Sequence, residues 1–126
     1  MLDHIGISVA DFNRAKAFYE RLLAALSINV VMEFPGDGGG GHAGFGKAGS
    51  PFFWIGEGRP PSGPIHIAFM ADSRDQVDAF HRAGLAAGGS DNGAPGLRPH
   101  YHPDYYGAFL IDPDGNNVEA VCHKPA

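Results

Sequence analysis

Residues 105–122 read YYGAFLIDPDGNNVEAVC and predict a β-hairpin. Two apolar runs flank the turn sequence DPDG at 112–115, in which proline presets φ and glycine takes the strained position. Glu119 stands between Val118 and Ala120 in a strand that otherwise favours burial. A buried carboxylate costs free energy unless it is paired or binds a metal ion. Glu119 therefore belongs either to a solvated strand face or to a site.

The first half of the chain predicts a strand, a helix and further strands. Residues 4–9, HIGISV, alternate with a period of two, which is typical of a strand with one buried face. Apolar side chains then recur at helical spacing over 12–26, behind Asp11 as an N-cap. A glycine-rich loop is expected at 36–41. Further strands are expected around 28–34, 42–45 and 51–55.

The second half repeats this pattern. Residues 65–70, IHIAFM, alternate again, and a second helical pattern follows them. Aligning His4 with His66 also aligns Phe18 with Phe80, at corresponding places in a strand and a helix. This agreement indicates an internal repeat of two β-α-β-β-β units.

The repeat sets the expected organisation. Residues 57–63 are rich in proline and glycine, so they are interpreted as a linker between a module at 1–56 and a module at 64–126. With 126 residues, the two modules are expected to form a single α+β domain.

Bulk composition excludes several classes of protein. The 44% hydrophobic and 18% charged residues favour a soluble globular chain, and no apolar run reaches membrane-spanning length. The net charge of −5 disfavours a role in nonspecific nucleic-acid binding. The single cysteine, Cys122, precludes an internal disulfide. Because the first strand also begins almost at Met1, with no leader pattern before it, we expect a cytoplasmic protein.

Three side chains form the candidate site. His4 and His66 occupy matched positions on the less apolar face of the first strand of each unit, and each has a small same-face neighbour, Gly6 or Ala68. If the aliphatic faces pack under helices, then His4, His66 and Glu119 project into a common concavity. Two imidazoles and a carboxylate suit a divalent transition metal. Taken singly, each histidine favours a hydrogen-bonded structural role. Two histidines at matched positions of a repeat, together with Glu119, favour a metal site instead.

These residues resemble the vicinal oxygen chelate superfamily, which includes glyoxalase I, extradiol dioxygenases, bleomycin-resistance proteins and fosfomycin-resistance thiol transferases. The resemblance covers nearly the whole chain. Its most specific stretches are DHIGISVAD at 3–11, AFY at 17–19, IHIAF at 65–69 and FLIDPDGNNVE at 109–119. It implies paired β-α-β-β-β modules whose sheets curl around a central cleft holding a metal ion. By position, His4, His66 and Glu119 match three metal ligands of the family.

One ligand of glyoxalase I has no counterpart. Those enzymes place Glu or Gln on the last strand of the first module, where this chain has Phe52, Phe53, Trp54 and Ile55; Glu57 lies beyond, in the expected linker. The departure disfavours lactoylglutathione lyase activity. It favours the three-ligand members, which include dioxygenases and thiol transferases.

The resemblance also bears on substrate and assembly. Trp54, Tyr101 and Tyr106 are the candidate substrate-binding residues, and Arg98 could steer an anionic substrate. We expect one divalent ion (Fe, Mn, Ni or Zn), a small-molecule substrate with adjacent oxygens, and a homodimer whose cleft lies within one chain or between two. The leading interpretation is a metal-dependent lyase or dioxygenase-like enzyme. The alternatives are a non-catalytic binder of the bleomycin-resistance kind and a scaffold with a vestigial cleft.

Overall fold

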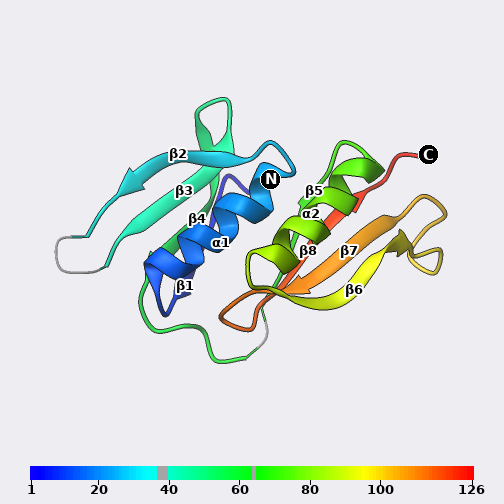
Figure 1. Cartoon of the computed structure of the whole chain (residues 1–126). Helices are drawn as coiled ribbons and strands as arrows, with labels where there is room; N and C mark the ends of the chain where they lie inside the picture. The colour runs from blue at the N-terminus through cyan, green and yellow to red at the C-terminus, as the bar shows by residue number, and fades with distance from the viewer. Residues whose placement is uncertain (37–39, 64) are drawn as a thin grey trace.

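The computed structural model describes residues 1–36, 40–63 and 65–126, so the centre of the expected glycine-rich loop and Pro64 lie outside the described residues. Two units of β-α-β-β-β follow each other along the chain, as the repeat predicts (Figure 1). The first comprises β1 (Ile5–Val9), α1 (Phe12–Ala24), β2 (Asn29–Phe34), β3 (His42–Lys47) and β4 (Ser50–Glu57). The second comprises β5 (His66–Met70), α2 (Arg74–Ala86), β6 (Ser90–Leu97), β7 (Tyr106–Ile111) and β8 (Asn117–Cys122).

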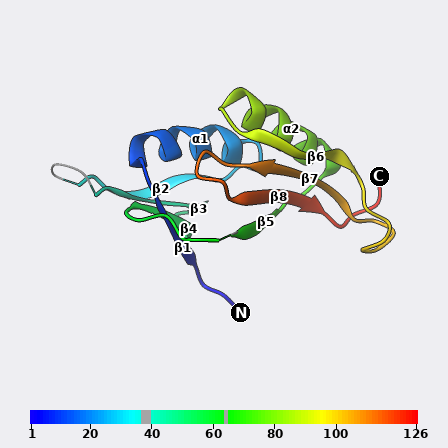
Figure 2. The ribbon, with the colours of Figure 1, turned by 90° about the horizontal axis from the view of Figure 1, so that it is seen from below.

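Each unit forms its own mixed sheet. The strand orders among the described residues are β1-β4-β3-β2 and β5-β8-β7-β6, with β1–β4 and β5–β8 parallel and the other pairs antiparallel. The helices lie side by side on one side of the molecule, and the sheets lie beneath them (Figure 2). The predicted α+β class with paired modules is therefore confirmed. Among the described residues both helices lie on one side, so the opposite face of each sheet is not covered by a helix (Figure 2).

Local sequence explains where the helices begin. Asp11 caps α1 by accepting a hydrogen bond from the backbone N–H of Arg14 at 3.0 Å. Ser73 caps α2 by accepting from the N–H of Gln76, whose side chain in turn accepts from the N–H of Asp72. These contacts satisfy backbone donors that have no partner within a helix.

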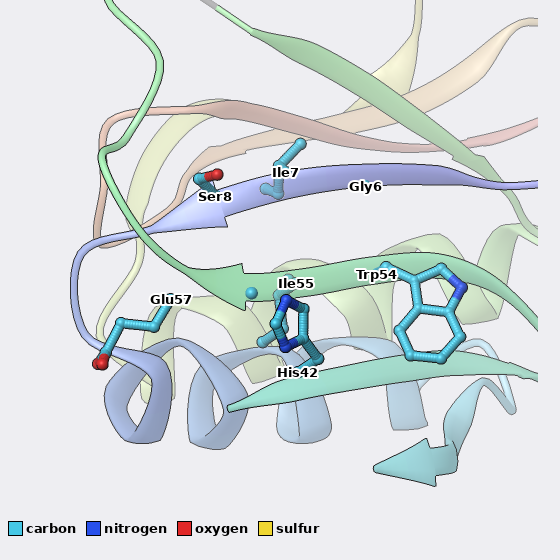
Figure 3. Close-up of a pocket in the computed structure, with 8 residues that line it drawn as sticks. Gly6, Ile7, Ser8, His42, Trp54, Ile55 and Glu57 are labelled. Atoms are coloured by element: carbon cyan, nitrogen blue, oxygen red, sulfur yellow. The ribbon is translucent and has the colours of Figure 1, made fainter. Parts of the chain in front are cut away.

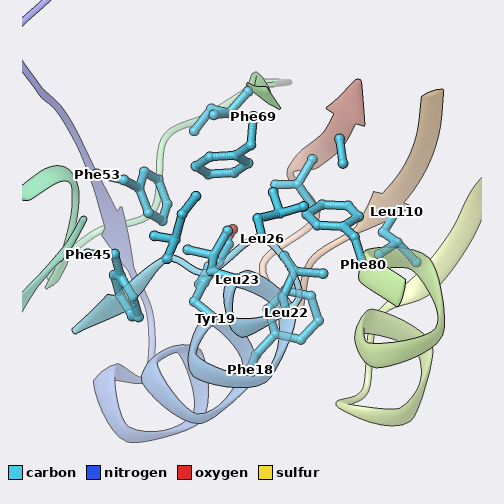
Figure 4. Close-up of a cluster of buried hydrophobic side chains, with 14 of the residues drawn as sticks. Phe18, Tyr19, Leu22, Leu23, Leu26, Phe45, Phe53, Phe69, Phe80 and Leu110 are labelled. Carbon is cyan, nitrogen blue, oxygen red and sulfur yellow. The ribbon is translucent and has the colours of Figure 1, made fainter. Parts of the chain in front are cut away.

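A single apolar core joins the modules (Figure 4). It lies between the helices and the covered faces of both sheets, where the largest fully buried side chains include Tyr19, Phe18, Phe45, Phe53 and Phe80. Gly84 of α2 lets this helix lie close to Leu110 of β7 and Leu22 of α1. A Cβ at this position would lie 2.2 Å from Cδ1 of Leu110 and 2.8 Å from Cδ1 of Leu22. The absence of a side chain lets α2 pack against β7 and α1 together.

A buried polar contact also links the modules. Asp112, at the start of the β7–β8 turn, is 4% exposed and accepts a hydrogen bond from the hydroxyl of Tyr19 in α1. Its carboxylate also accepts from the N–H of Asp114 and from the backbone and side-chain amides of Asn116. The turn sequence that predicts the hairpin thus also fastens the hairpin to the first module.

The buried hydroxyl of Tyr19 makes the free energy of unfolding depend on pH in the alkaline range. Burial, followed by the charge of Asp112, raises the pKa of Tyr19 well above its ordinary value of 10.0. The unfolded chain therefore releases this proton at lower pH than the folded chain, and stability falls as pH rises above 10. We expect the free energy of unfolding of the wild type to fall by up to about 1.4 kcal/mol per pH unit more steeply than that of Tyr19→Phe. Urea unfolding between pH 8 and pH 11 measures both slopes, and equal slopes would contradict the assignment.

Candidate functional site

The open face of the second sheet holds a histidine–carboxylate pair. In the β5–β8 register Ala68 lies opposite Glu119, which places Glu119 on the same face as His66. Nε2 of His66 lies 2.8 Å from Oε1 of Glu119. Glu119 is only 1% exposed, whereas the His66 side chain is 52% exposed. The pair is therefore a buried acid with an imidazole at the surface of the sheet.

Tyr105 completes this pair. Its hydroxyl donates to Oε2 of Glu119, so each oxygen of the carboxylate has one partner. A Cβ on Gly107 would lie 3.2 Å from the Tyr105 ring and 3.4 Å from Oε2, so the glycine leaves room for the contact. Burial, and then the bond to Glu119, raises the pKa of Tyr105. The hydroxyl therefore stays protonated and orients the carboxylate.

Sequence reasoning missed Tyr105 and named its neighbours. The hydroxyl of Tyr106 donates to Asp78 of α2 at 2.6 Å, so Tyr106 faces the helix and not the His66–Glu119 pair. Tyr101 is exposed and packs its ring against Tyr105 at 4.9 Å. The alternation of side chains along a strand could have identified Tyr105. Phe109 pairs with Glu119 across β7 and β8, so residues 105 and 107 lie on the same face of the sheet as Glu119, and Tyr106 lies on the other face.

His4 and an aromatic wall line a hollow at the open face of the first sheet. His4 precedes β1, has a side chain that is 58% exposed, and places Nδ1 2.7 Å from a carboxylate oxygen of Asp3. It lines a hollow of about 380 Å³ with Gly6, Phe34, His42 and Trp54. The rings of Trp54 and Phe34 stack with centroids 6.1 Å apart. Trp54 therefore shares a hollow with His4.

A second hollow of about 210 Å³ adjoins the first and also includes Gly6, His42 and Trp54 (Figure 3). The side chains of His42 and Trp54 project from β3 and β4 on the same side of this sheet. Glu57 was expected in the linker, but it is the last residue of β4 and pairs with Val9 of β1. Its carboxylate accepts hydrogen bonds from the backbone N–H groups of Phe12 and Gly40. Glu57 is the carboxylate nearest in sequence to the missing fourth ligand position. Both of its oxygens accept from backbone N–H groups.

The three predicted ligands do not gather within one chain. His66 and Glu119 touch, but His4 lies just before β1 of the other sheet. Within residues 1–36, 40–63 and 65–126 of a single chain, no group of three or more His, Cys, Asp or Glu side chains is arranged to hold a metal ion. His4 does reach the boundary between the modules, where it lines a hollow of about 270 Å³ with Ala68 and Phe69.

In the described part of the chain, neither helix is long and apolar enough to cross a membrane. No curated protein matches the sequence. Solved structures do match it.

A glyoxalase/bleomycin resistance protein from Albidiferax ferrireducens T118 has 30% sequence identity, with 99% of each chain covered and a TM-score of 0.79. A glyoxylase/bleomycin resistance protein/dioxygenase domain from Frankia sp. EAN1pec has 16% identity and a TM-score of 0.72, and the match covers 98% of each chain. Glyoxalase I from Zea mays has 21% identity and a TM-score of 0.72; the match covers 96% of this chain and 45% of that one, so this chain spans about half its length. The model of the Glyoxalase/Bleomycin resistance protein/Dioxygenase superfamily matches residues 1–120, and the chain therefore belongs to this superfamily.

Proposed function

We propose that the protein is a metal-dependent enzyme acting on a small substrate with adjacent oxygen atoms. The observation that carries the proposal is the His66–Glu119 pair, in which a carboxylate that is 1% exposed is held between an imidazole and a tyrosine hydroxyl. These two partners offset the cost of burying the acid and hold it next to the surface of the sheet. The half-exposed imidazole leaves one side of the pair open to a ligand.

The donor set fits a divalent ion. Members of the superfamily commonly use a divalent metal. Imidazole nitrogen and carboxylate oxygen are ligands for Fe, Mn, Ni and Zn. His66 and Glu119 would hold the ion together with a second imidazole, and Tyr105 would orient the carboxylate from behind, as partners of metal ligands commonly do. Such an ion supplies Lewis-acid chemistry toward two adjacent substrate oxygens.

We propose that the second imidazole is His4 of the partner subunit. In one chain His4 lies just before β1 of the first sheet, whereas His66 and Glu119 lie on the second sheet. Both sheets have a face that no helix of the described residues covers (Figure 2). Those faces carry exposed apolar side chains, among them Phe34 at 56% and Met70 at 70% exposure. Superfamily members often form dimers. Facing the first sheet of one chain against the second sheet of another would cover this apolar surface and complete the ligand set twice in a symmetric dimer.

The chain's own residues would divide the remaining work. Trp54 and Phe34 form a stacked apolar wall beside His4, which would receive the apolar body of a substrate and exclude water. Gly6 and Ala68, the small residues beside the two histidines, leave open space next to the ligands. A substrate with an aromatic or bulky body and two adjacent oxygens fits these surroundings.

Mixed dimers test the sharing of ligands. In a shared site, a purified heterodimer of a His4→Ala chain and a His66→Ala chain contains one intact site and one doubly damaged site. We expect it to bind about one ion per dimer, whereas neither variant homodimer binds one tightly. Elemental analysis after removal of free metal, with the two chains carrying different affinity tags, measures this.

A heterodimer of wild type with the double variant His4→Ala/His66→Ala is the mirror control. Shared sites leave it without an intact site, but sites built within one chain leave it with one. Metal bound by the mirror control and absent from the first heterodimer would overturn the sharing of ligands. Wild-type protein that takes up none of Mn²⁺, Fe²⁺, Ni²⁺ or Zn²⁺ would overturn the metal-dependent function itself.

A non-catalytic small-molecule binder is the second candidate. The observation in its favour is the aromatic hollow beside His4, which exists in one chain without any contribution from the His66–Glu119 pair. A binder of this kind retains ligand affinity after treatment with a chelator, and the enzyme proposed above loses turnover under the same treatment.

A further inference from the structure

We propose that Arg98 forms an anion-binding position beside the His66–Glu119 pair, so that the substrate or ligand carries a carboxylate, phosphonate or phosphate group. This inference rests on the proposed function in placing a substrate on this face of the second sheet. The position itself would belong to the protein with or without a metal ion.

Arg98 lies over the face that carries the pair. Its guanidinium carbon is 5.4 Å from the centroid of the Phe109 ring. Phe109 is paired with Glu119 across β7 and β8, and its ring centroid is 6.2 Å from that of His66. Phe109 is therefore a platform with the cation above it and the candidate metal ligands beside it. A cation over an aromatic face is attracted by the electron density of the ring.

The guanidinium is held in place by its own segment of chain. One terminal nitrogen donates to the carbonyl of Gly96 and the other to the carbonyl of Ala94, both at 2.8 Å. A Cβ on Gly93 would lie 3.2 Å from one of these nitrogens, and a Cβ on Gly96 would lie 3.3 Å from the other. The glycines therefore leave the space that the guanidinium uses. A group fixed before the ligand arrives loses less conformational entropy on binding.

The positive charge of Arg98 is not matched by a carboxylate. Among the described residues, Arg98 makes no ion pair, and its two side-chain hydrogen bonds go to neutral carbonyls. A guanidinium has five N–H donors, so these bonds leave others for a ligand oxygen. Arginine also suits the planar or tetrahedral oxyanions named above, because its parallel N–H groups can engage two oxygens at once.

Arg74, the first residue of α2, provides a matched control. Its guanidinium also lies over an aromatic ring, that of Tyr106, at 5.1 Å. Its charge, however, is opposed by Asp104 at 3.9 Å, and Tyr106 faces α2 instead of the candidate site. Arg74→Gln therefore removes the same charge and a similar stacking contact without touching the proposed position.

The test uses phenylphosphonate and an uncharged aromatic probe, benzyl alcohol, with the 126-residue chain freed of metal. We expect phenylphosphonate to bind the wild type more tightly than benzyl alcohol, and Arg98→Gln to weaken phenylphosphonate binding about 10- to 100-fold. Arg98→Lys keeps the charge and should restore part of the loss, while Arg74→Gln should change nothing. Ligand-observed NMR titration gives the affinities. The arginine Nε–H signal that disappears in Arg98→Gln is assigned to Arg98, and a change in its chemical shift when phenylphosphonate is added to the wild type reports contact with that side chain.

Three results would overturn the proposal: equal affinity of the wild type for the charged and the neutral probe, unchanged phenylphosphonate binding in Arg98→Gln, or an equal loss in Arg74→Gln. Circular dichroism and thermal melting identify a variant that fails to fold, and Arg98→Lys then decides between the outcomes. Because every measurement is made without metal, failure here is distinct from failure of metal binding.

Discussion

Replacing Glu119 with glutamine is expected to abolish tight binding of a divalent ion, with affinity falling by about 100-fold or more. Loss of a partner that only orients a ligand costs about 10- to 100-fold, and Glu119 would be a ligand itself. The amide keeps the shape of the buried side chain, which is 1% exposed, but removes the negative charge that faces Nε2 of His66 at 2.8 Å. Isothermal titration with Mn²⁺ or Zn²⁺, together with elemental analysis, measures the loss.

Glu33→Gln is the control for general effects of removing a carboxylate. Glu33 lies on β2 of the first sheet, outside the proposed ligand set. Its side chain is 35% exposed, and its carboxylate lies 3.2 Å from Nζ of Lys16. We expect it to retain the affinity of the wild type. His66→Ala should resemble Glu119→Gln in metal binding, because both remove one member of the same pair. An unchanged affinity in both site variants would refute the ligand assignment even if the protein binds metal elsewhere.

Much of the fold follows from periodicity in the sequence. The alternation at 4–9 and 65–70 corresponds to β1 and β5, and the helical spacing beginning at Phe12 corresponds to α1. These patterns are local, and each burial pattern is set by neighbours within one strand or helix. The match between the two halves predicts that both units repeat one topology, and the order of elements agrees with it.

The site was predictable only in part. The sequence pattern brings His66 and Glu119 to one face, since strand alternation decides the face of each residue. It does not decide whether His4 faces them within a chain or across two, because that depends on how the sheets are placed. The sequence names Arg98 as a residue that could steer an anionic substrate, but it does not predict that Arg98 lies over Phe109, since that depends on an irregular register in β6, where the pairing shifts between Asp91 and Gly96.

The second large effect concerns Asp112. Its carboxylate is 4% exposed and accepts from the Tyr19 hydroxyl, the N–H of Asp114 and both amide donors of Asn116. Asp112→Ala would leave these donors without their acceptor where water has little access. Each unmet buried donor costs about 1–3 kcal/mol. We expect a total destabilisation of about 3–5 kcal/mol, measured by urea unfolding, and a fall in melting temperature of about 10–20 °C.

The pair formed by Tyr106 and Asp78 separates the effect of burial from that of the bond itself. It has the same chemical groups, with the hydroxyl 2.6 Å from the carboxylate, but it is only partly buried. We expect Tyr106→Phe to cost no more than about 1 kcal/mol, because water can replace the lost donor, and Tyr19→Phe to cost about 1–2 kcal/mol. A double-mutant cycle between Tyr19→Phe and Asp112→Asn should show coupling. Independent effects of those two changes, or an Asp112→Ala protein as stable as wild type, would mean that the helices and core alone hold the hairpin against α1.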